Sequence, residues 1–458
     1  MDSPAENPYE SPEAPLDSSV FPPYAPPSGP SLPQPTAASI KHDAYGALRI
    51  PAFRRYVSGN VLSLIGMQMQ TTAVGWEVYE LTGSAMSLAM VGLAQVVPVM
   101  ALSLVTGHVA DRFSRRLVIC MAVATVATVS VALAINSHYW HSVQAMYGLL
   151  LLNGVARAFQ QPAKASYMPT LVPRVMFPNA VTWTTSGFQL ATVLGPAAAG
   201  ATIAAVGGAA IVYAINAGAT FVFVVLLMSI PRSTSPRQIE PFTWRSLAAG
   251  VGFLRRKPIV LGAILLDMFA VLLGGATAML PIFAKDILEV GPSGLGWLRA
   301  APAVGALITA MIIAHRPPME RAGRAMLISV FGFGLATIGF GFSTSFAFSL
   351  AMMFTIGVMD NVSVIVRHTL VQVLTPDAMR GRVSAINGMF ISMSNELGEV
   401  ESGVVATFFG PVIAVVTGGV GTLLVVAIAA YAWPDLRRYG RLGDGGDIDG
   451  GDETETAA

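Results

Sequence analysis

Residues 107–118 read GHVADRFSRRLV, and this short charged stretch joins two long apolar runs at 84–109 and 117–135. A helix that crosses the ~30 Å hydrocarbon core of a bilayer needs about twenty mostly apolar residues. Both runs approach or exceed that length, so we expect the stretch to be the turn of a membrane hairpin. Its Arg112, Arg115 and Arg116 indicate the cytoplasmic side, where the loops of membrane proteins collect positive charge.

Apolar runs of the same kind recur along most of the chain. The composition is 53% hydrophobic and 12% charged, whereas about a quarter of the residues of a soluble domain are charged. The sequence therefore predicts an all-α membrane protein with twelve transmembrane helices. The expected spans are 56–78, 84–109, 117–135, 144–162, 178–204, 209–230, 258–284, 293–314, 325–344, 346–366, 383–409 and 411–433.

The basic residues test this number of spans, because an error of one helix would disturb their alternation between the two sides. All but three of the 27 lysines and arginines fall in alternate loops or near the ends of the chain. Lys285 lies in an opposite-side loop, and Arg157 and Arg299 lie within spans. We therefore expect both termini in the cytoplasm and the protein in a bacterial inner membrane.

The sequence predicts two six-helix halves, with a tail at each end of the chain and a linker between the halves. A Pro-rich tail at 1–44 and an acidic, Gly-rich tail at 434–458 contain too little apolar surface to fold, so disorder is expected in both. The halves are expected at 45–230 and 258–433. The linker at 231–257 contains an amphipathic stretch with a basic end, typical of a helix that lies along the membrane surface.

The halves resemble each other after a shift of about 203 residues, which indicates an internal duplication. GLAQVVP at 92–98 aligns with GWLRAAP at 296–302, and LVP at 171–173 aligns with LTP at 374–376. Gly154 aligns with Gly357, and Lys164 with Arg367. The sequence thus predicts two pseudo-symmetric halves of six helices each.

The stretch at 107–118 resembles the G-x3-D-R-x2-R-R signature of the major facilitator superfamily of transporters. The resemblance implies that Gly107, Asp111 and the three arginines close the cytoplasmic face, with Asp111 near the start of the eleventh helix. In physical terms, an anion is favourable at a helix N-terminus, and arginines hold carboxylates. The alternative is a positively charged anchor, which explains the arginines but not Gly107 or Asp111.

A weaker version of this signature, MERAGRAM at 319–326, occupies the corresponding loop of the second half and contains Glu320, Arg321 and Arg324. Further stretches resemble the enterobactin-exporter-like branch of the superfamily, the transmembrane secretion effectors. They are GWEVYELTGS at 75–84, LVPRVMFPNA at 171–180 and LTPDAMRGRVSAINGMF at 374–390. The resemblance extends over residues 45–435 and implies export.

The fifth predicted helix contains GPAAAG at 195–200. With Gly195, Pro196 and Gly200, it partly resembles the antiporter motif of the superfamily. The alternative is ordinary close packing of small residues between membrane helices.

An ionisable group inside the bilayer costs a few kcal/mol, so each one needs a partner, a cavity or a function. The resemblance implies that helices 1, 4, 7 and 10 line a central cavity while helices 3, 6, 9 and 12 face lipid. The predicted spans 3, 6, 9 and 12 contain no charged residue. The ionisable residues of the other spans are Glu77, Arg157, Asp267, Arg299, Asp360, Glu396, Glu399 and Glu401.

Glu396 and Glu399 are three residues apart and so project from one face of their helix. Close, buried carboxylates favour protonation, which suits a group that binds and releases a proton during transport. Asp267 is the other candidate near the middle of a span. The alternatives are a structural pairing of the glutamates with Arg299 and direct contact with the substrate.

Arg157 and Asp360 occupy equivalent positions in the two halves, and one hypothesis is that they pair in one conformation. The alternative is that each has a separate local partner. Uncharged polar residues within the spans are expected either to line the solute path or to join helices. They are Gln68, Gln70, Gln95 and Gln189.

The sequence favours a secondary transporter over an enzyme or an ATP-driven pump. No lysine follows a glycine as a phosphate-binding loop requires, and neither a catalytic cluster nor a metal or cofactor site stands out. We expect a monomer that binds a small molecule and protons or another ion, not nucleic acid. A proton-coupled exporter of an amphipathic compound, such as a siderophore or a drug-like molecule, is the first hypothesis. A solute importer and a non-transporting sensor or scaffold are the alternatives.

Overall fold

The computed structural model of the chain describes residues 43–112, 114–231, 250, 252–317 and 319–440; the side chains at 103–112, 377, 378 and 385 are not described. The helices below belong to one compact unit that begins at Tyr45. The described residues form helices and turns, with no strand among them. Of the two expected disordered tails, 1–42 and 441–458 lie outside the described residues.

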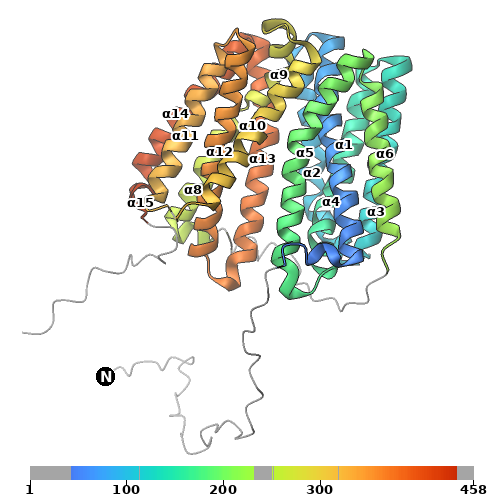
Figure 1. Ribbon diagram of the computed structural model, residues 1–458. Coiled ribbons are helices and arrows are strands. Elements are labelled where there is room, and N and C mark those ends of the chain that lie inside the picture. The colour runs from blue at the N-terminus through green and yellow to red at the C-terminus, as the bar shows by residue number, and fades with distance from the viewer. Residues whose placement is uncertain (1–42, 113, 232–249, 251, 318, 441–458) are drawn as a thin grey trace, which may run out of the picture. The chain divides into compact units, whose positions relative to one another are not determined.

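The first half consists of six long helices, coloured blue to green in Figure 1. They are α1 (Pro51–Thr82), α2 (Ala85–Arg112), α3 (Arg115–Ile135), α4 (Val143–Tyr167), α5 (Phe177–Val206) and α6 (Ala210–Met228). Short turns of helix precede α1 (Ala47–Arg49), follow α3 (Asn136–Trp140) and link α4 to α5 (Met168–Thr170 and Arg174–Met176).

The second half repeats this arrangement from α8 (Pro258–Leu273) onward. After α8 the segment continues through η5 (Ala276–Met279), α9 (Leu280–Ile282) and η6 (Phe283–Ile287). The helix is interrupted at Gly274 and Gly275. A Cβ on Gly275 would lie 2.7 Å from the Gly398 carbonyl oxygen of α13, so the backbones approach too closely there for a side chain. The other helices are α10 (Gly291–Ala314), α11 (Ala322–Gly341), α12 (Phe346–Leu374), α13 (Asp377–Phe409), α14 (Pro411–Ala432) and the short α15 (Pro434–Arg438).

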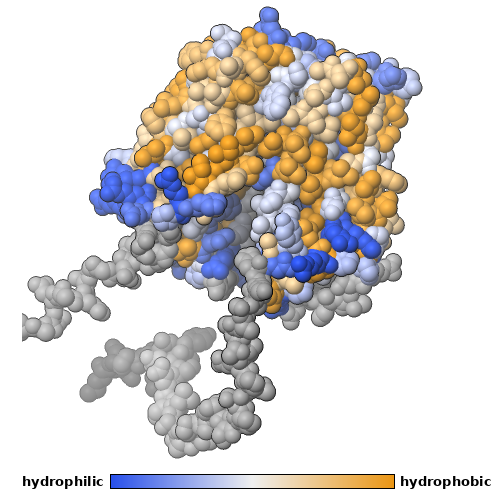
Figure 2. Space-filling model, in the orientation of Figure 1, coloured by the Kyte–Doolittle hydropathy of each residue, from blue (hydrophilic) through white to orange (hydrophobic). Residues whose placement is uncertain are grey.

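The helices correspond to the twelve predicted spans, with the seventh broken as described. By length and composition, nine of the helical segments in the described part of the chain could cross a membrane. The other three, α1, α4 and α13, have 32, 25 and 33 residues and contain Arg157, Glu396 and Glu399, which are discussed below. Figure 2 shows apolar residues over the middle of the helical unit and hydrophilic residues toward both ends.

The internal repeat is visible in how each half is packed. At Gly154 of α4, a Cβ would come within 2.6 Å of the Gln95 carbonyl oxygen and 3.2 Å of Pro98 Cγ on α2. At Gly357 of α12, a Cβ would collide with the Pro302 carbonyl oxygen on α10. The aligned glycines therefore bring the aligned helices together in the same way in both halves.

Small residues also bring the two halves together, since α5 packs on α10 and α2 packs on α13. At Gly296 of α10, a Cβ would lie 2.6 Å from the Pro196 carbonyl oxygen and 3.2 Å from the Gly200 Cα. At Gly403 of α13, a Cβ would lie 2.6 Å from Ala89 Cβ on α2. Close packing, the alternative for the GPAAAG stretch, thus describes the contacts of Pro196 and Gly200, while Gly195 packs on α1.

Parts of the expected linker and C-terminal tail lie among the described residues. Most of the linker lies outside them, but 252–256 is helical, within the stretch expected to be amphipathic, and Leu254 is buried in a cluster with Val260 of α8 and Val383 and Ile386 of α13. After α14, the Ala322 amide donates a hydrogen bond of 3.1 Å to the Gly440 carbonyl. Residues 434–440 therefore pack against the second half.

The close approach at Gly154 gives a first prediction. Replacing Gly154 with valine should lower the free energy of unfolding by about 1–3 kcal/mol, because the new side chain would overlap the α2 backbone. The matched control is Gly148→Val on the same helix, where a Cβ would meet nothing within 4 Å. Denaturant unfolding of the purified variants in detergent measures the difference, and equal stability of the two variants would contradict the packing.

Candidate functional site

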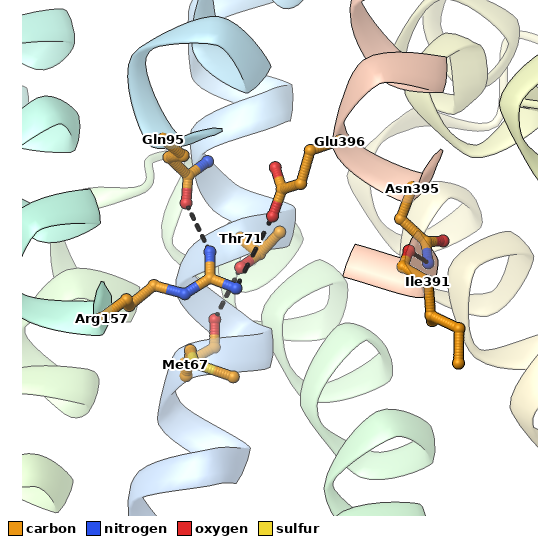
Figure 3. Close-up of polar contacts among 7 residues, drawn as sticks. All are labelled: Met67, Thr71, Gln95, Arg157, Ile391, Asn395 and Glu396. Carbon is orange, nitrogen blue, oxygen red and sulfur yellow. Dashed lines mark hydrogen bonds and ion pairs between the residues drawn. The ribbon is translucent and has the colours of Figure 1, made fainter. Parts of the chain in front are cut away.

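The two halves meet at an ion pair in the middle of the helical unit. Arg157 of α4 approaches Glu396 of α13, with 3.7 Å between Nη2 and Oε1 (Figure 3). Arg157 Nη1 also donates a 3.2 Å hydrogen bond to Gln95 Oε1 of α2. The two charged side chains are 28% and 24% exposed, so the pair is neither fully buried nor freely solvated. It joins the halves at a point that water reaches.

A cleft lies beside this ion pair, between α1, α2 and α4. In this conformation it has room for about one water-sized particle, and its volume including the open mouth is about 280 Å³. Gln70, Gln95, Asn153 and Arg157 provide polar groups, and apolar side chains of α1 and α4 complete the lining. Among the described residues, the buried Oδ1 of Asn153 has no hydrogen-bond partner. The cleft thus combines apolar walls with a few polar groups, as small-molecule sites do.

Glu399 lies one turn beyond Glu396 on α13 and also faces the first half. Its side chain packs where Gly92 of α2 leaves room, with Oε2 3.6 Å from the position of a Gly92 Cβ. Arg299 and Arg157 are close enough to act on it electrostatically. Arg299 of α10 in turn donates a 3.1 Å hydrogen bond to the Thr71 carbonyl of α1. The structure therefore brings together four of the predicted charges, Arg157, Arg299, Glu396 and Glu399.

Further contacts between the halves lie toward the end of the helical unit formed by the turn after α1. The Tyr79 hydroxyl donates a hydrogen bond to Asp286 of η6, and Lys285 Nζ lies 5.7 Å from the centre of the Tyr79 ring. A Cβ on Gly75 would lie 3.4 Å from Pro281 Cγ. Sequence reasoning missed this group, because its residues lie near predicted span ends, where polar residues are unremarkable.

A second ion pair lies inside the second half. Arg367 of α12 binds Asp267 of α8, and these side chains are only 3% and 5% exposed. The placement of Arg367 in a cytoplasmic loop was wrong, because α12 continues to Leu374. The apolar residues that follow Arg367 in the sequence could have indicated that the helix extends beyond it. Asp267, a predicted midplane candidate, thus has a structural partner.

The hypothesised pair of Arg157 and Asp360 is not formed in this structure. Arg157 turns toward α13 across the interface, whereas Asp360 lies near Asp267 and Arg367 within its own half. Their pairing in another conformation stays a prediction. Glu401 is also separate from the central group, and its Oε2 accepts a 3.4 Å hydrogen bond from the adjacent Ser402.

The described arginines of the 107–118 stretch bind within the first half. Arg115 Nη1 donates a 2.7 Å hydrogen bond to the Ser166 carbonyl, and Arg116 donates to the Met228 and Ile230 carbonyls at the end of α6. Cationic side chains at helix C-termini satisfy free carbonyls and favour the helix dipole. The side chains of Gly107, Asp111 and Arg112 lie outside the described part, so the gate stays a prediction.

The second-half counterparts of this stretch are solvent-exposed. Glu320, Arg321 and Arg324 lie at or just before the start of α11. Their position matches the corresponding loop of the first half, and their gating role is likewise a prediction. In the described part of the chain, no group of histidine, cysteine and carboxylate side chains could hold a metal ion.

Other buried polar residues join helices within the first half. Gln70 Oε1 accepts hydrogen bonds from Ser130 at 2.7 Å and Asn216 at 2.8 Å, which links α1 to α3 and α6. Glu77 accepts a 2.6 Å hydrogen bond from the Tyr213 hydroxyl. These contacts hold α1 in place beside the cleft.

A comparison with protein families identifies the kind of protein. The family model of the transmembrane secretion effectors matches residues 42–438. The chain belongs to this family. Transmembrane secretion effectors are transporters of the major facilitator superfamily, so this one is a multi-pass membrane transporter of small molecules and not an enzyme.

Curated relatives of this secretion effector include enterobactin exporters. The enterobactin exporter EntS of Escherichia coli O1:K1 is 28% identical over 397 residues, which cover 85% of this chain and 93% of the relative. EntS of Shigella boydii serotype 18 matches over the same length with the same identity. The similarity therefore spans both halves.

Solved structures with the same fold have much lower sequence identity. A bacterial homologue of the human lysosomal transporter Spinster, inward-facing and unoccupied, has a TM-score of 0.65 at 15% identity and covers 84% of this chain and 96% of its own. A point mutant of the peptide transporter POT has a TM-score of 0.65 at 13% identity, and the match covers 84% of this chain and 95% of that one. These neighbours confirm the twelve-helix fold of the major facilitator superfamily.

The ion pair between the halves gives a second prediction. Arg157→Gln and Glu396→Gln should each slow transport by the secretion effector, and the double variant should be no slower than the slower single variant. The expected coupling energy is about 0.5–1 kcal/mol, since the partly exposed pair is screened by water. Initial transport rates measure it.

The control combines Glu396→Gln with Arg174→Gln. The Arg174 side chain is exposed in the turn between α4 and α5. The effects of these two substitutions on the transport rate, expressed as free energies, should add. If the Arg157 and Glu396 effects also add fully, the two residues do not act on each other during transport.

Proposed function

We propose that this secretion effector is a proton-coupled exporter of a small amphipathic molecule, such as a siderophore or a drug-like compound. The observation that carries the proposal is the position of Glu396 and Glu399 on α13, facing Arg157 of the opposite half. Two carboxylates and two guanidinium groups meet there beside the polar cleft. A change in their protonation alters the attraction between the halves.

The coupling works through the Arg157–Glu396 pair. Exchange requires that the proton and the substrate compete for one group, and Glu396 provides it. When Glu396 is ionised, a hydroxyl group of a substrate in the adjacent cleft can donate a hydrogen bond to it, while Gln95 orients the neighbouring Arg157 guanidinium group. When Glu396 is protonated, it loses most of its attraction for that hydroxyl group and for Arg157, because its negative charge is gone. Proton binding therefore releases the substrate, and release of the proton lets the next substrate bind.

Access alternates when the halves move against each other about this site. For the cleft to open toward the Tyr79 end, the Tyr79–Asp286 hydrogen bond and the Gly75–Pro281 contact must separate. The packing of α5 on α10 at Gly200 and Gly296 must loosen as well. The tight packing at Gly154 and Gly357 lies inside the halves, which therefore move as rigid bodies.

The chemistry of the cleft supports an amphipathic substrate. Met67, Val74 and Leu150 offer apolar surface, whereas Asn153 and Arg157 offer a free carbonyl oxygen and a cation. A ligand with an aromatic or aliphatic body and acidic or hydroxyl groups matches both parts. The enterobactin exporters among the relatives agree with this substrate class and with outward transport.

The charge distribution supports placement in an inner membrane with both termini in the cytoplasm. In Figure 1, α1 begins and α14 ends at the same end of the helical unit. Arg115, Arg174 and Arg437 lie at or near helix ends there, as the positive-inside rule expects of a cytoplasmic side. The Tyr79–Asp286 contact would then close the periplasmic side.

Everted membrane vesicles with an acidic interior test the coupling and the direction together. An exporter should accumulate the candidate compound in these vesicles in exchange for protons, and dissipation of the pH gradient should stop the accumulation. Glu396→Gln and Glu399→Gln should lose this dependence, because neither amide can carry the exchanged proton. Glu80→Gln, an exposed position near the end of α1, is the control and should behave like the wild type.

Three results would count against the proposal. Accumulation that ignores the gradient would exclude proton antiport. Accumulation driven only by the opposite gradient would favour the importer. Full activity of both glutamine variants would exclude these glutamates as the coupling groups.

A further inference from the structure

The second half contains a group of buried and half-buried charges that does not balance. Asp267 of α8 and Asp360 of α12 both lie close to Arg367, which forms its ion pair with Asp267. Two carboxylates thus share one guanidinium group. A buried carboxylate without a compensating charge is costly at low dielectric, so the group needs one more positive charge when both aspartates are ionised.

A small cavity adjoins these charges. Asp267, Asp360 and Ser363 contribute its polar lining, and the rest consists of apolar side chains from α8 and α11 such as Val330 and Phe333. The cavity has room for about one water-sized particle. It is therefore large enough for a small ion or a hydrated proton.

Two polar atoms in this region have no hydrogen-bond partner among the described residues. They are Ser363 Oγ and Arg367 Nε, and each residue is only 2% exposed. Ser363 follows Asp360 by three residues and so lies on the same face of α12. Buried hydroxyl groups without a partner are uncommon and call for an explanation. A bound cation or proton-carrying water would satisfy the Ser363 oxygen.

The charged residues of the surrounding helices do not supply the missing charge. Asp267 and Arg367 are the charged groups that act on Asp360. The remaining titratable or charged residues with described side chains on the packed helices α10 to α13 are Arg299, Arg324, His368, Arg380, Arg382, Glu396, Glu399 and Glu401. None of these acts detectably on Asp360. A mobile positive charge is therefore the simplest way to balance the site.

We propose that Asp360, Ser363 and Asp267 form a binding site for one small monovalent cation, H⁺ or Na⁺. With the cation bound, Arg367 stays paired with Asp267 and Asp360 is neutralised. With the site empty, the single guanidinium group must serve both carboxylates, which changes how α12 sits on α8. The site lies within one half, apart from Glu396 and Glu399, and goes beyond the proposed function because it requires neither a substrate nor export.

Thermal unfolding of the purified full-length protein tests the site, because a ligand that binds the folded state raises its melting temperature. One series varies NaCl against choline chloride at constant ionic strength and pH 8. The other series lowers the pH at constant Na⁺. Stabilisation by NaCl alone identifies Na⁺, and stabilisation by acid without a Na⁺ effect identifies H⁺.

Asp360→Asn should abolish the cation-dependent stabilisation, because the amide has no negative charge to neutralise. Ser363→Ala keeps every charge and removes one ligand oxygen, so it should raise the half-saturating cation concentration about tenfold. Glu80→Gln is the control and should respond like the wild type.

The measurements are repeated in the Glu396→Gln, Glu399→Gln double variant, which removes the proposed coupling groups. The cation-dependent stabilisation attributed to Asp360 should persist in this variant. The experiment therefore tests the cation site independently of the proposed transport function. A wild type that responds to neither cation, or a Ser363→Ala variant with unchanged half-saturation, would overturn the proposal. An Asp360→Asn variant that keeps the wild-type response would also overturn it.

Discussion

A charge inside the hydrocarbon layer requires a partner, and this requirement organises the interior of the secretion effector. Where water does not reach the charge, an unpaired carboxylate or guanidinium group costs several kcal/mol. Arg157 meets Glu396 across the interface, and Arg367 meets Asp267 inside one half. The first of these pairs lets the polar helices α4 and α13 face each other across the interface.

The location of each contact decides whether it holds the fold or permits motion. Contacts inside a half are buried and tight, as at Gly154 and in the Asp267–Arg367 pair. Contacts between the halves are of two kinds, close packing of small residues and a few polar contacts that water can reach. The Arg157–Glu396 pair belongs to the second kind. Breaking it costs little, because water can solvate both groups, whereas breaking the buried pair would leave two charges without solvent. Rigid halves and a separable interface follow from this difference.

The sequence predicts much of this fold, because an apolar run of membrane length and a basic loop are strong local signals. The cost of a buried charge also identified Arg157, Glu396 and Asp360 as interior residues. Their partners could not be predicted, because the face that a helix turns toward its neighbours depends on packing. The helix-to-helix approach set by Gly357 is one example. Arg367 was misplaced for a related reason, since an arginine near the end of an apolar run has the pattern of a cytoplasmic anchor.

Cross-linking the halves at the Tyr79 end is the most direct test of the claim that they separate there during transport. Cys120 is the only cysteine of the chain, so a Cys120→Ala background leaves Gly75→Cys and Pro281→Cys as a single reactive pair. Oxidation should join the two cysteines and stop transport, and a reductant should restore it. Oxidant should not affect either single variant. Transport at the wild-type rate by the fully cross-linked protein would contradict the account.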